Sequence, residues 1–143
     1  MDRLLDDFRA FWCEHAELYL ERQPYHEAAA QLVFMAYLQR VVNGGGLVDR
    51  EYGVGRGRID LHVRWNGPAG LERWGIELKT WRDRSPDPLP KALDQLHAYL
   101  ARLGLGEGIL VVFDQRSTAP PITERSRRNR IEHRGKTIDV VWL

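Results

Sequence analysis

The unbroken apolar run Ile109–Phe113 constrains the fold more than any other stretch of the 143-residue sequence. A strand with one solvated face alternates apolar and polar residues, whereas a continuous apolar strand is buried on both faces. The run follows a segment, 89–103, in which leucine recurs at helical spacing. A helix that leads into a doubly buried strand is typical of a crossover between parallel strands, so we expect an α/β fold.

The remaining elements complete a mixed sheet. Two runs, Arg58–Trp65 and Glu72–Trp81, flank a turn-like segment at 66–70 and predict a β-hairpin. One crossover helix then implies one parallel pair in an otherwise antiparallel sheet. The other expected elements are helices at 2–22 and 25–43, a strand at 47–54, a polar, arginine-rich loop at 115–136 and a final strand at 137–143.

Length and composition indicate one globular domain over 1–143. Within it we expect a helical extension at 1–24, a core at about 25–114, and a basic loop with a final strand at 115–143. The net charge of +1 means that any nucleic-acid contact must rest on a local basic patch. The lone Cys13 and the lack of an apolar run of roughly 20 residues predict a cytoplasmic protein without membrane partners.

The register of the hairpin follows from its hydrophobic pattern. Successive residues of a strand point to opposite faces, so a shift by one residue would expose every apolar side chain. The register that makes one face apolar brings Asp60 opposite Glu77 on the other face, with Lys79 two residues further along. The apolar pairs are Ile59 with Leu78, Leu61 with Ile76, and Val63 with Trp74.

Asp60, Glu77 and Lys79 are the candidate catalytic residues. Two carboxylates so close repel each other unless a cation lies between them, and oxygen ligands favour Mg²⁺ or Mn²⁺. Such an ion polarises a phosphodiester and activates water, while a lysine orients the nucleophile or offsets developing charge. The alternative is a solvated strand face with a cross-strand ion pair.

Further polar residues are candidates for the same site. Lys91, Gln95, Tyr99 and Arg102 share one side of the helix at 89–103, off its leucine stripe. They would hold a phosphate or the lysine if that side looked toward the sheet; otherwise they form a solvent face. Glu27 is equally compatible with a further metal-ligating carboxylate and with a helix-start charge favoured by the dipole.

Arginines supply the candidate phosphate contacts, although Glu124 and Glu132 are interleaved with those near the C-terminus. A basic hairpin that simply faces solvent is therefore equally compatible with the pattern. Trp81 gives no indication of nucleic-acid binding. The candidate nucleic-acid-binding residues are Arg56, Arg58, Lys91, Arg125, Arg127 and Arg128.

These motifs together resemble the PD-(D/E)XK nuclease superfamily. In order, the chain has a helix carrying Glu27, the motif Gly57-Arg58-Ile59-Asp60, the motif Glu77-Leu78-Lys79, and Gln95-Leu96-His97-Ala98-Tyr99. Ile59 stands where the family name has proline. The stretches that begin at Val41 and at Glu77 also resemble the nuclease-like domain that ends certain large bacterial AAA-type ATPases.

The resemblance implies a restriction-endonuclease-like three-layer sandwich, with a mixed central β-sheet flanked by helices. Asp60, Glu77 and the Leu78 carbonyl would bind the metal, Lys79 would be catalytic, and Gln95 and Tyr99 would support the site. We therefore expect an Mg²⁺-dependent (or Mn²⁺-dependent) endo- or exonuclease that acts on DNA. The alternatives are a non-catalytic DNA-binding or assembly module, tethered to an ATPase domain in the same or a companion chain, and a scaffold whose first helix forms a homodimer.

Overall fold

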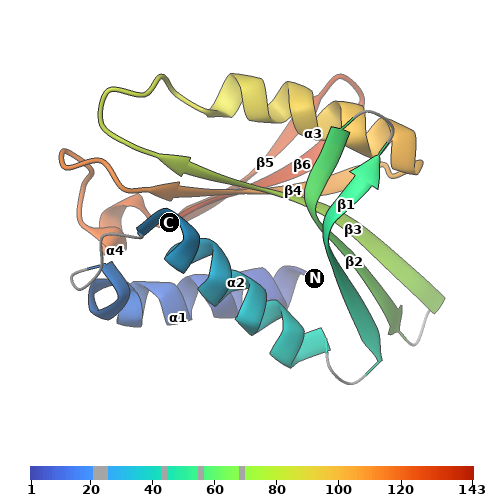
Figure 1. The fold of residues 1–143 in the computed structure, drawn as a ribbon, viewed down its shortest axis with the longest axis horizontal. Coiled ribbons are helices and arrows are strands. Elements are labelled where there is room, and N and C mark those ends of the chain that lie inside the picture. Colours follow the sequence, from blue (N-terminus) through green and yellow to red (C-terminus); the bar gives the residue numbers. More distant parts are fainter. Residues whose placement is uncertain (21–25, 43–44, 55–56, 68–69) are drawn as a thin grey trace.

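The computed structural model describes residues 1–20, 26–42, 45–54, 57–67 and 70–143 as an α/β protein with a six-stranded mixed sheet (Figure 1). The predicted α/β class and mixed sheet are confirmed. Within the described ranges, no helix has the length and hydropathy to cross a membrane. The elements are α1 (Asp2–Leu20), α2 (His26–Val42), β1 (Gly46–Val54), β2 (Gly57–Gly67), β3 (Gly70–Trp81), α3 (Leu89–Leu103), β4 (Glu107–Asp114), α4 (Ile122–Arg125), β5 (Arg127–His133) and β6 (Lys136–Trp142).

The strands lie in the order β1-β2-β3-β4-β6-β5. The pairs β1–β2, β2–β3 and β5–β6 are antiparallel, whereas β4 runs parallel to both β3 and β6. The prediction of one parallel pair is therefore wrong, because the described strands form two. The second pair arises because β6 inserts between β4 and the edge strand β5.

Strand β5 and the short helix α4 occupy part of the segment that was predicted to be a loop, 115–136, so that prediction is wrong. The polar composition of β5 hides its alternation, since it is an edge strand with mostly exposed side chains. Arg134 (φ 49°) and Gly135 (φ 77°) join β5 to β6. Positive φ at both central residues is what a two-residue hairpin turn requires.

The two faces of the sheet carry separate hydrophobic cores (Figure 1). On the α1–α2 face, Phe8 contacts Phe34 with ring centroids 4.7 Å apart, and Trp12 contacts Phe113 at 5.3 Å. On the α3 face, leucines of α3 cover β4 and β6. β4 contributes to both cores, which confirms that the run Ile109–Phe113 is buried on both faces.

Close contact between α3 and the sheet depends on two glycines. A Cβ atom at Gly108 would lie 2.6 Å from Leu100 Cδ1, and one at Gly75 would lie 2.7 Å from Ile59 Cδ1 and 3.1 Å from Leu100 Cδ2. α3 ends at Gly104, whose φ of 66° is the left-handed conformation that favours glycine after a helix. The missing side chains on β3 and β4 therefore determine how closely α3 approaches the sheet.

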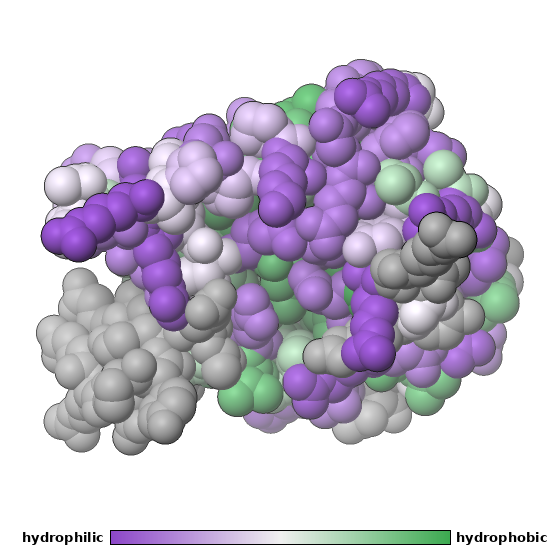
Figure 2. Space-filling model, turned by 45° about the horizontal axis from the view of Figure 1, so that its top comes forward, coloured by the Kyte–Doolittle hydropathy of each residue, from purple (hydrophilic) through white to green (hydrophobic). Residues whose placement is uncertain are grey.

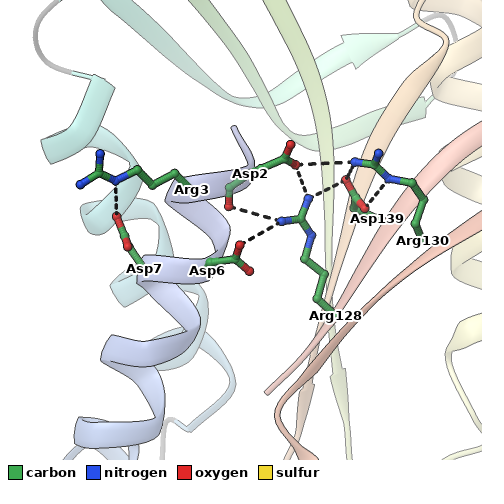
Figure 3. Close-up of polar contacts among 7 residues, drawn as sticks. All are labelled: Asp2, Arg3, Asp6, Asp7, Arg128, Arg130 and Asp139. Atoms are coloured by element: carbon green, nitrogen blue, oxygen red, sulfur yellow. Dashed lines mark hydrogen bonds and ion pairs between the residues drawn. The ribbon is translucent and has the colours of Figure 1, made fainter.

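Ion pairs attach the start of α1 to the far edge of the sheet (Figure 3). Arg128 on β5 pairs with Asp139 on β6 at 3.0 Å, with Asp6 at 3.5 Å, and also with Asp2. Arg130 shares Asp139 at 2.9 Å. Both arginines hold the pKa of the Asp139 carboxyl below its ordinary value, although burial acts in the opposite direction.

We predict that Gly108→Ala lowers the free energy of unfolding by about 1–3 kcal/mol, because the added methyl group would overlap Leu100. Gly106→Ala is the matched control, since nothing lies within 4 Å of a Cβ atom there. Urea unfolding measures both. Adding Leu100→Ala to Gly108→Ala should cost less than the sum of the two single changes, and strict additivity would contradict the close contact.

We also predict that Arg128→Met lowers the free energy of unfolding by about 1–2 kcal/mol, because the change leaves partly buried Asp139 with one partner fewer. Arg3→Met is the control, since Arg3 pairs with Asp7 at 3.7 Å and its side chain is 95% exposed. Its effect should stay within about 0.5 kcal/mol. Equal losses of unfolding free energy in Arg128→Met and Arg3→Met would show that the ion pairs of Arg128 stabilise the fold no more than an exposed pair does.

Candidate functional site

Strand β3 separates a hydrophobic face from a polar one. Ile76 and Leu78 belong to the core on the α1–α2 face, so the alternate residues Glu77 and Lys79 lie on the α3 face. Gly75 confirms this orientation, because its missing Cβ atom points at Leu100 of α3. Two candidate catalytic residues thus share the side of the sheet that α3 covers.

The predicted hairpin register is confirmed where the ladder between β2 and β3 is formed, with Leu61 opposite Ile76 and Val63 opposite Trp74. Beyond Leu61, β2 remains paired with β1 as far as Gly57. There the link to β3 is a side-chain hydrogen bond: the Leu78 backbone N–H donates to Asp60 Oδ2 at 2.7 Å. Asp60 is therefore brought to β3 by its carboxylate.

Ile59 corrects the predicted apolar face. We expected Ile59 to share a face with Leu61 and Leu78, but it belongs to the core on the α3 face and lies against the Cα position of Gly75. The physical reason is that this end of β2 follows β1 and turns toward α3, which strict alternation along a flat strand does not anticipate. The turn brings Asp60 to the α3 side of β3.

Glu77 is a fully buried carboxylate, with an exposed fraction of 0%. Its Oε1 accepts a hydrogen bond from Lys79 Nζ at 2.6 Å, while its Oε2 is buried and has no hydrogen-bond partner among the described residues. Burial and the nearby charge of Asp60 raise the pKa of the Glu77 carboxyl to about 7, although Lys79 and the Asp60 backbone oppose the shift. A buried oxygen without a partner is costly, so Glu77 requires a proton, a water molecule or a cation.

The carboxylates fit a divalent cation. Glu77 Oε2 is an unsatisfied oxygen, and the Leu78 backbone holds the Asp60 carboxylate beside it. Within the described ranges, no three His, Cys, Asp or Glu side chains form a metal-binding cluster. Mg²⁺ is often bound by only one or two carboxylates, with water and substrate phosphates as the other ligands. Asp60, Glu77 and the Leu78 carbonyl would be the protein ligands of such an ion.

Gln95 and Tyr99 lie on one flank of α3, where Gln95 Nε2 donates to the Tyr99 hydroxyl at 3.3 Å. The opposite flank is fixed by Asp94, which contacts His133 beside the β5–β6 turn at 2.9 Å. The Gln95–Tyr99 flank therefore faces β2 and β3, the strands that carry Asp60 and Glu77. Lys91 is exposed on α3.

Those candidate nucleic-acid-binding residues that the structure describes do not lie in one patch. Arg58 is exposed on β2, and Arg125 donates to the Pro120 carbonyl at 3.1 Å. Arg127 stacks over Trp142 on the α3 face, whereas Arg128 is engaged with aspartates on the α1–α2 face (Figure 3). Arg56 and the side chain of Glu27 lie outside the described part of the chain.

A hydrophobic pocket of about 350 Å³ lies on the α1–α2 face, away from the candidate catalytic residues. Because the sheet separates it from Glu77, it adds no group to the candidate site. Its lining includes Leu4, Tyr37, Val63, Trp65 and Trp74.

Sequence reasoning missed a polar group at the carboxyl end of β4. Asp114 is only 5% exposed, and its two oxygens accept hydrogen bonds from Arg116 Nε at 2.8 Å and Nη2 at 2.6 Å. The Arg116 guanidinium lies 3.4 Å from the centre of a Trp81 ring. The available signal was an aspartate directly after a doubly buried strand, since ligands of α/β proteins gather outside the carboxyl ends of parallel strands.

No family model, curated protein or solved structure matches the chain. Its function must therefore be inferred from the chemistry of its own residues. Hydrophilic residues cover most of the face shown in Figure 2, which includes the α3 side, and hydrophobic ones show near its centre and along its lower and right margins.

We predict that Glu77→Gln stabilises the metal-free protein increasingly as pH rises. A raised folded-state pKa means that the wild-type protein loses stability between about pH 4.5, the ordinary value, and about 7. Glutamine mimics the protonated carboxyl group. In EDTA, the gain in unfolding free energy of Glu77→Gln over the wild-type protein should therefore be absent at pH 4.5 and reach at most about 3 kcal/mol at pH 8.

Glu72→Gln removes a partly exposed carboxylate from the same strand and is the control for loss of one negative charge. Urea unfolding at several pH values compares the variants with the wild-type protein. An advantage of Glu77→Gln that does not grow with pH would contradict the raised pKa.

Proposed function

We propose that this chain is a Mg²⁺- or Mn²⁺-dependent nuclease of the PD-(D/E)XK type that hydrolyses phosphodiester bonds of DNA. The observation that carries the proposal is the buried Glu77 carboxylate, whose Oε2 has no hydrogen-bond partner among the described residues, beside Asp60 and Lys79. Proteins rarely retain such a group without a functional reason, because it costs folding stability.

The arrangement of elements supports a restriction-endonuclease-like fold. The motifs occur in the order noted in the sequence, with Glu27 on α2, Asp60 on β2, Glu77 on β3, and Gln95 and Tyr99 on α3. Helices on both faces of the mixed sheet are what a three-layer sandwich requires (Figure 1). β2, β3 and α3 would bring Asp60, Glu77, Gln95 and Tyr99 together on the α3 face, whereas α2, which carries Glu27, packs on the opposite face of the sheet.

Each residue has a role in this chemistry. A bound divalent ion would lower the pKa of a water molecule and neutralise charge on the phosphate. Glu77 and Asp60 would hold that ion. Lys79, which is partly exposed and bonded to Glu77 at 2.6 Å, would orient the nucleophile and offset negative charge as it develops on the phosphate.

One observation favours the alternative, a non-catalytic DNA-binding or assembly module tethered to an AAA-type ATPase. The Lys79 ammonium already neutralises one oxygen of Glu77. In a module of this kind the ion pair would be permanent, and no cation would be needed beside it. Metal binding therefore distinguishes the two functions.

We predict that Lys79→Gln lowers the rate of metal-dependent DNA cleavage by roughly 10²–10⁴-fold, measured both as nicking of plasmid DNA and as cleavage of single-stranded DNA. Glutamine can still donate a hydrogen bond to buried Glu77, so the fold should persist and the melting temperature reports on it. Arg73→Gln removes an exposed cation from the same strand and should leave the rate unchanged. Equal cleavage by Lys79→Gln and the wild-type protein would refute the assigned role.

Calorimetric titration with Mn²⁺ tests the site directly. Asp60→Asn and Glu77→Gln should each abolish binding, and Glu72→Gln should retain it. Wild-type protein that binds DNA but neither binds Mn²⁺ nor cuts DNA with Mg²⁺ or Mn²⁺ would establish the non-catalytic module.

A further inference from the structure

A row of stacked cations and aromatic rings crosses the carboxyl end of the sheet on the α3 face. Arg116 lies over Trp81, the rings of Trp81 and Trp142 are 6.1 Å apart, and Arg127 lies over Trp142 at 4.9 Å. Trp81 is at the end of β3, and Trp142 is at the end of β6. The row therefore spans from the strand of the candidate catalytic residues to the edge of the sheet.

Arg116 is held rigidly within this row. One edge of its guanidinium bonds to both oxygens of buried Asp114, and one face lies on Trp81. Its side chain remains 27% exposed. Because one edge lies on Asp114 and one face on Trp81, we infer that the outer face of the guanidinium contributes to this exposure. A fixed planar cation with an open face stacks well on another flat ring, because little conformational entropy remains to be lost.

Hydrogen bonds involving the backbone stabilise the loops after β3 and β4, which surround the Arg116 guanidinium. The Gln115 N–H donates to the Trp81 carbonyl at 2.8 Å, and the Ser117 N–H donates to Asp83 Oδ1 at 3.0 Å. Trp81 Nε1 donates to the Ser85 carbonyl at 3.2 Å. The loop after β3 and the loop after β4 are thus joined, and Trp81 is fixed from both sides.

The acidic surroundings of Arg116 argue against simple phosphate binding. Asp114 neutralises its charge directly, and Asp83 and Asp87 lie near enough to act on it. A phosphate would meet repulsion from these carboxylates, whereas an uncharged nucleobase would not. The exposed face of Arg116 therefore suits a base better than it suits a backbone phosphate.

The Arg116 guanidinium lies near the candidate catalytic residues along β3, because it rests on Trp81. Lys79 and Trp81 lie on the same face two residues apart, which in a strand is about 6.6 Å. A base stacked on Arg116 would place the phosphate of its own or the next nucleotide within reach of Lys79. Bases inside a duplex have both faces covered by their neighbours and cannot stack in this way, whereas unpaired bases can.

We propose that the outer face of Arg116 is a stacking platform for an unpaired nucleobase, so that the substrate strand is single-stranded DNA. The proposal rests on the proposed nuclease function for the identity of the site. Binding in EDTA, where no metal-dependent cleavage occurs, tests the platform separately from cleavage.

The first arm uses the wild-type protein with fluorescently labelled oligo(dT) of ten nucleotides, an abasic strand of the same length, and a blunt duplex. Fluorescence anisotropy should show oligo(dT) binding about tenfold or more tightly than the abasic strand, which has the same phosphates but no bases. The duplex should also bind more weakly than oligo(dT). Equal affinity for oligo(dT) and the abasic strand would overturn the platform.

The second arm compares Arg116→Lys with Arg73→Lys, both of which retain the positive charge. Loss of the guanidinium plane at Arg116 should weaken oligo(dT) binding about tenfold or more and leave abasic-strand binding unchanged, whereas Arg73→Lys should change neither. Equal behaviour of the two variants would overturn the proposal. If base-dependent binding persists but Lys79→Gln cleaves single-stranded DNA like the wild-type protein, the platform stands and the assigned catalytic role falls.

Discussion

Close approach of α3 to the sheet is the constraint on which the candidate site depends. Leu100 occupies the space that side chains at Gly75 and Gly108 would fill. With either side chain present, α3 would have to lie further from β3 and β4, and water could enter beside Glu77. Burial of Glu77 raises its pKa, and its Oε2 has no hydrogen-bond partner in the part of the chain that the structure describes. The apolar contact of Leu100 with the two glycines therefore keeps the Glu77 carboxylate buried, and a buried carboxylate needs a cation or a proton to compensate its charge.

The charged residues on the two faces of the sheet are arranged differently. On the α1–α2 face, Arg128 and Arg130 meet Asp139 and aspartates of α1, so most of their charge is neutralised within the fold (Figure 3). On the α3 face, Asp60 and Glu77 face each other with Lys79 as the neighbouring cation. The first arrangement favours the folded state, whereas the second costs stability. That contrast is why the α3 face is the better candidate for function.

The sequence predicted the parts of the fold that hydrophobic periodicity controls. The bounds of α3, the pairs Leu61–Ile76 and Val63–Trp74, and the doubly buried β4 all follow from regular spacing. It offered β5 only as part of a basic hairpin that was an alternative to the expected loop, because the polar side chains of this edge strand show no clear alternation. Ile59 was misplaced because β2 turns away from the plane of β3, and sequence alternation carries no information on curvature.

The candidate site was predicted in its composition but not in its geometry. Asp60, Glu77 and Lys79 lie on the predicted face, yet Asp60 is held by the Leu78 backbone N–H, which no pattern of side chains indicates. Arg116 was missed for a related reason. Its role depends on a contact between the loop after β4 and the end of β3, and such long-range contacts depend on the assembled sheet.

From Gly75 to the end of β3, exposure on the α3 face increases, which provides a reason for the order of the residues there. Gly75 is buried beneath Leu100, Glu77 is fully buried, and Lys79 is 27% exposed. A deep carboxylate in a low-dielectric setting binds a small cation strongly, but it cannot reach a polymer. A lysine nearer the surface can reach a phosphate. Trp81 with Arg116, where the strand emerges, can then contact a base, so one strand arranges its groups by the depth at which each can act.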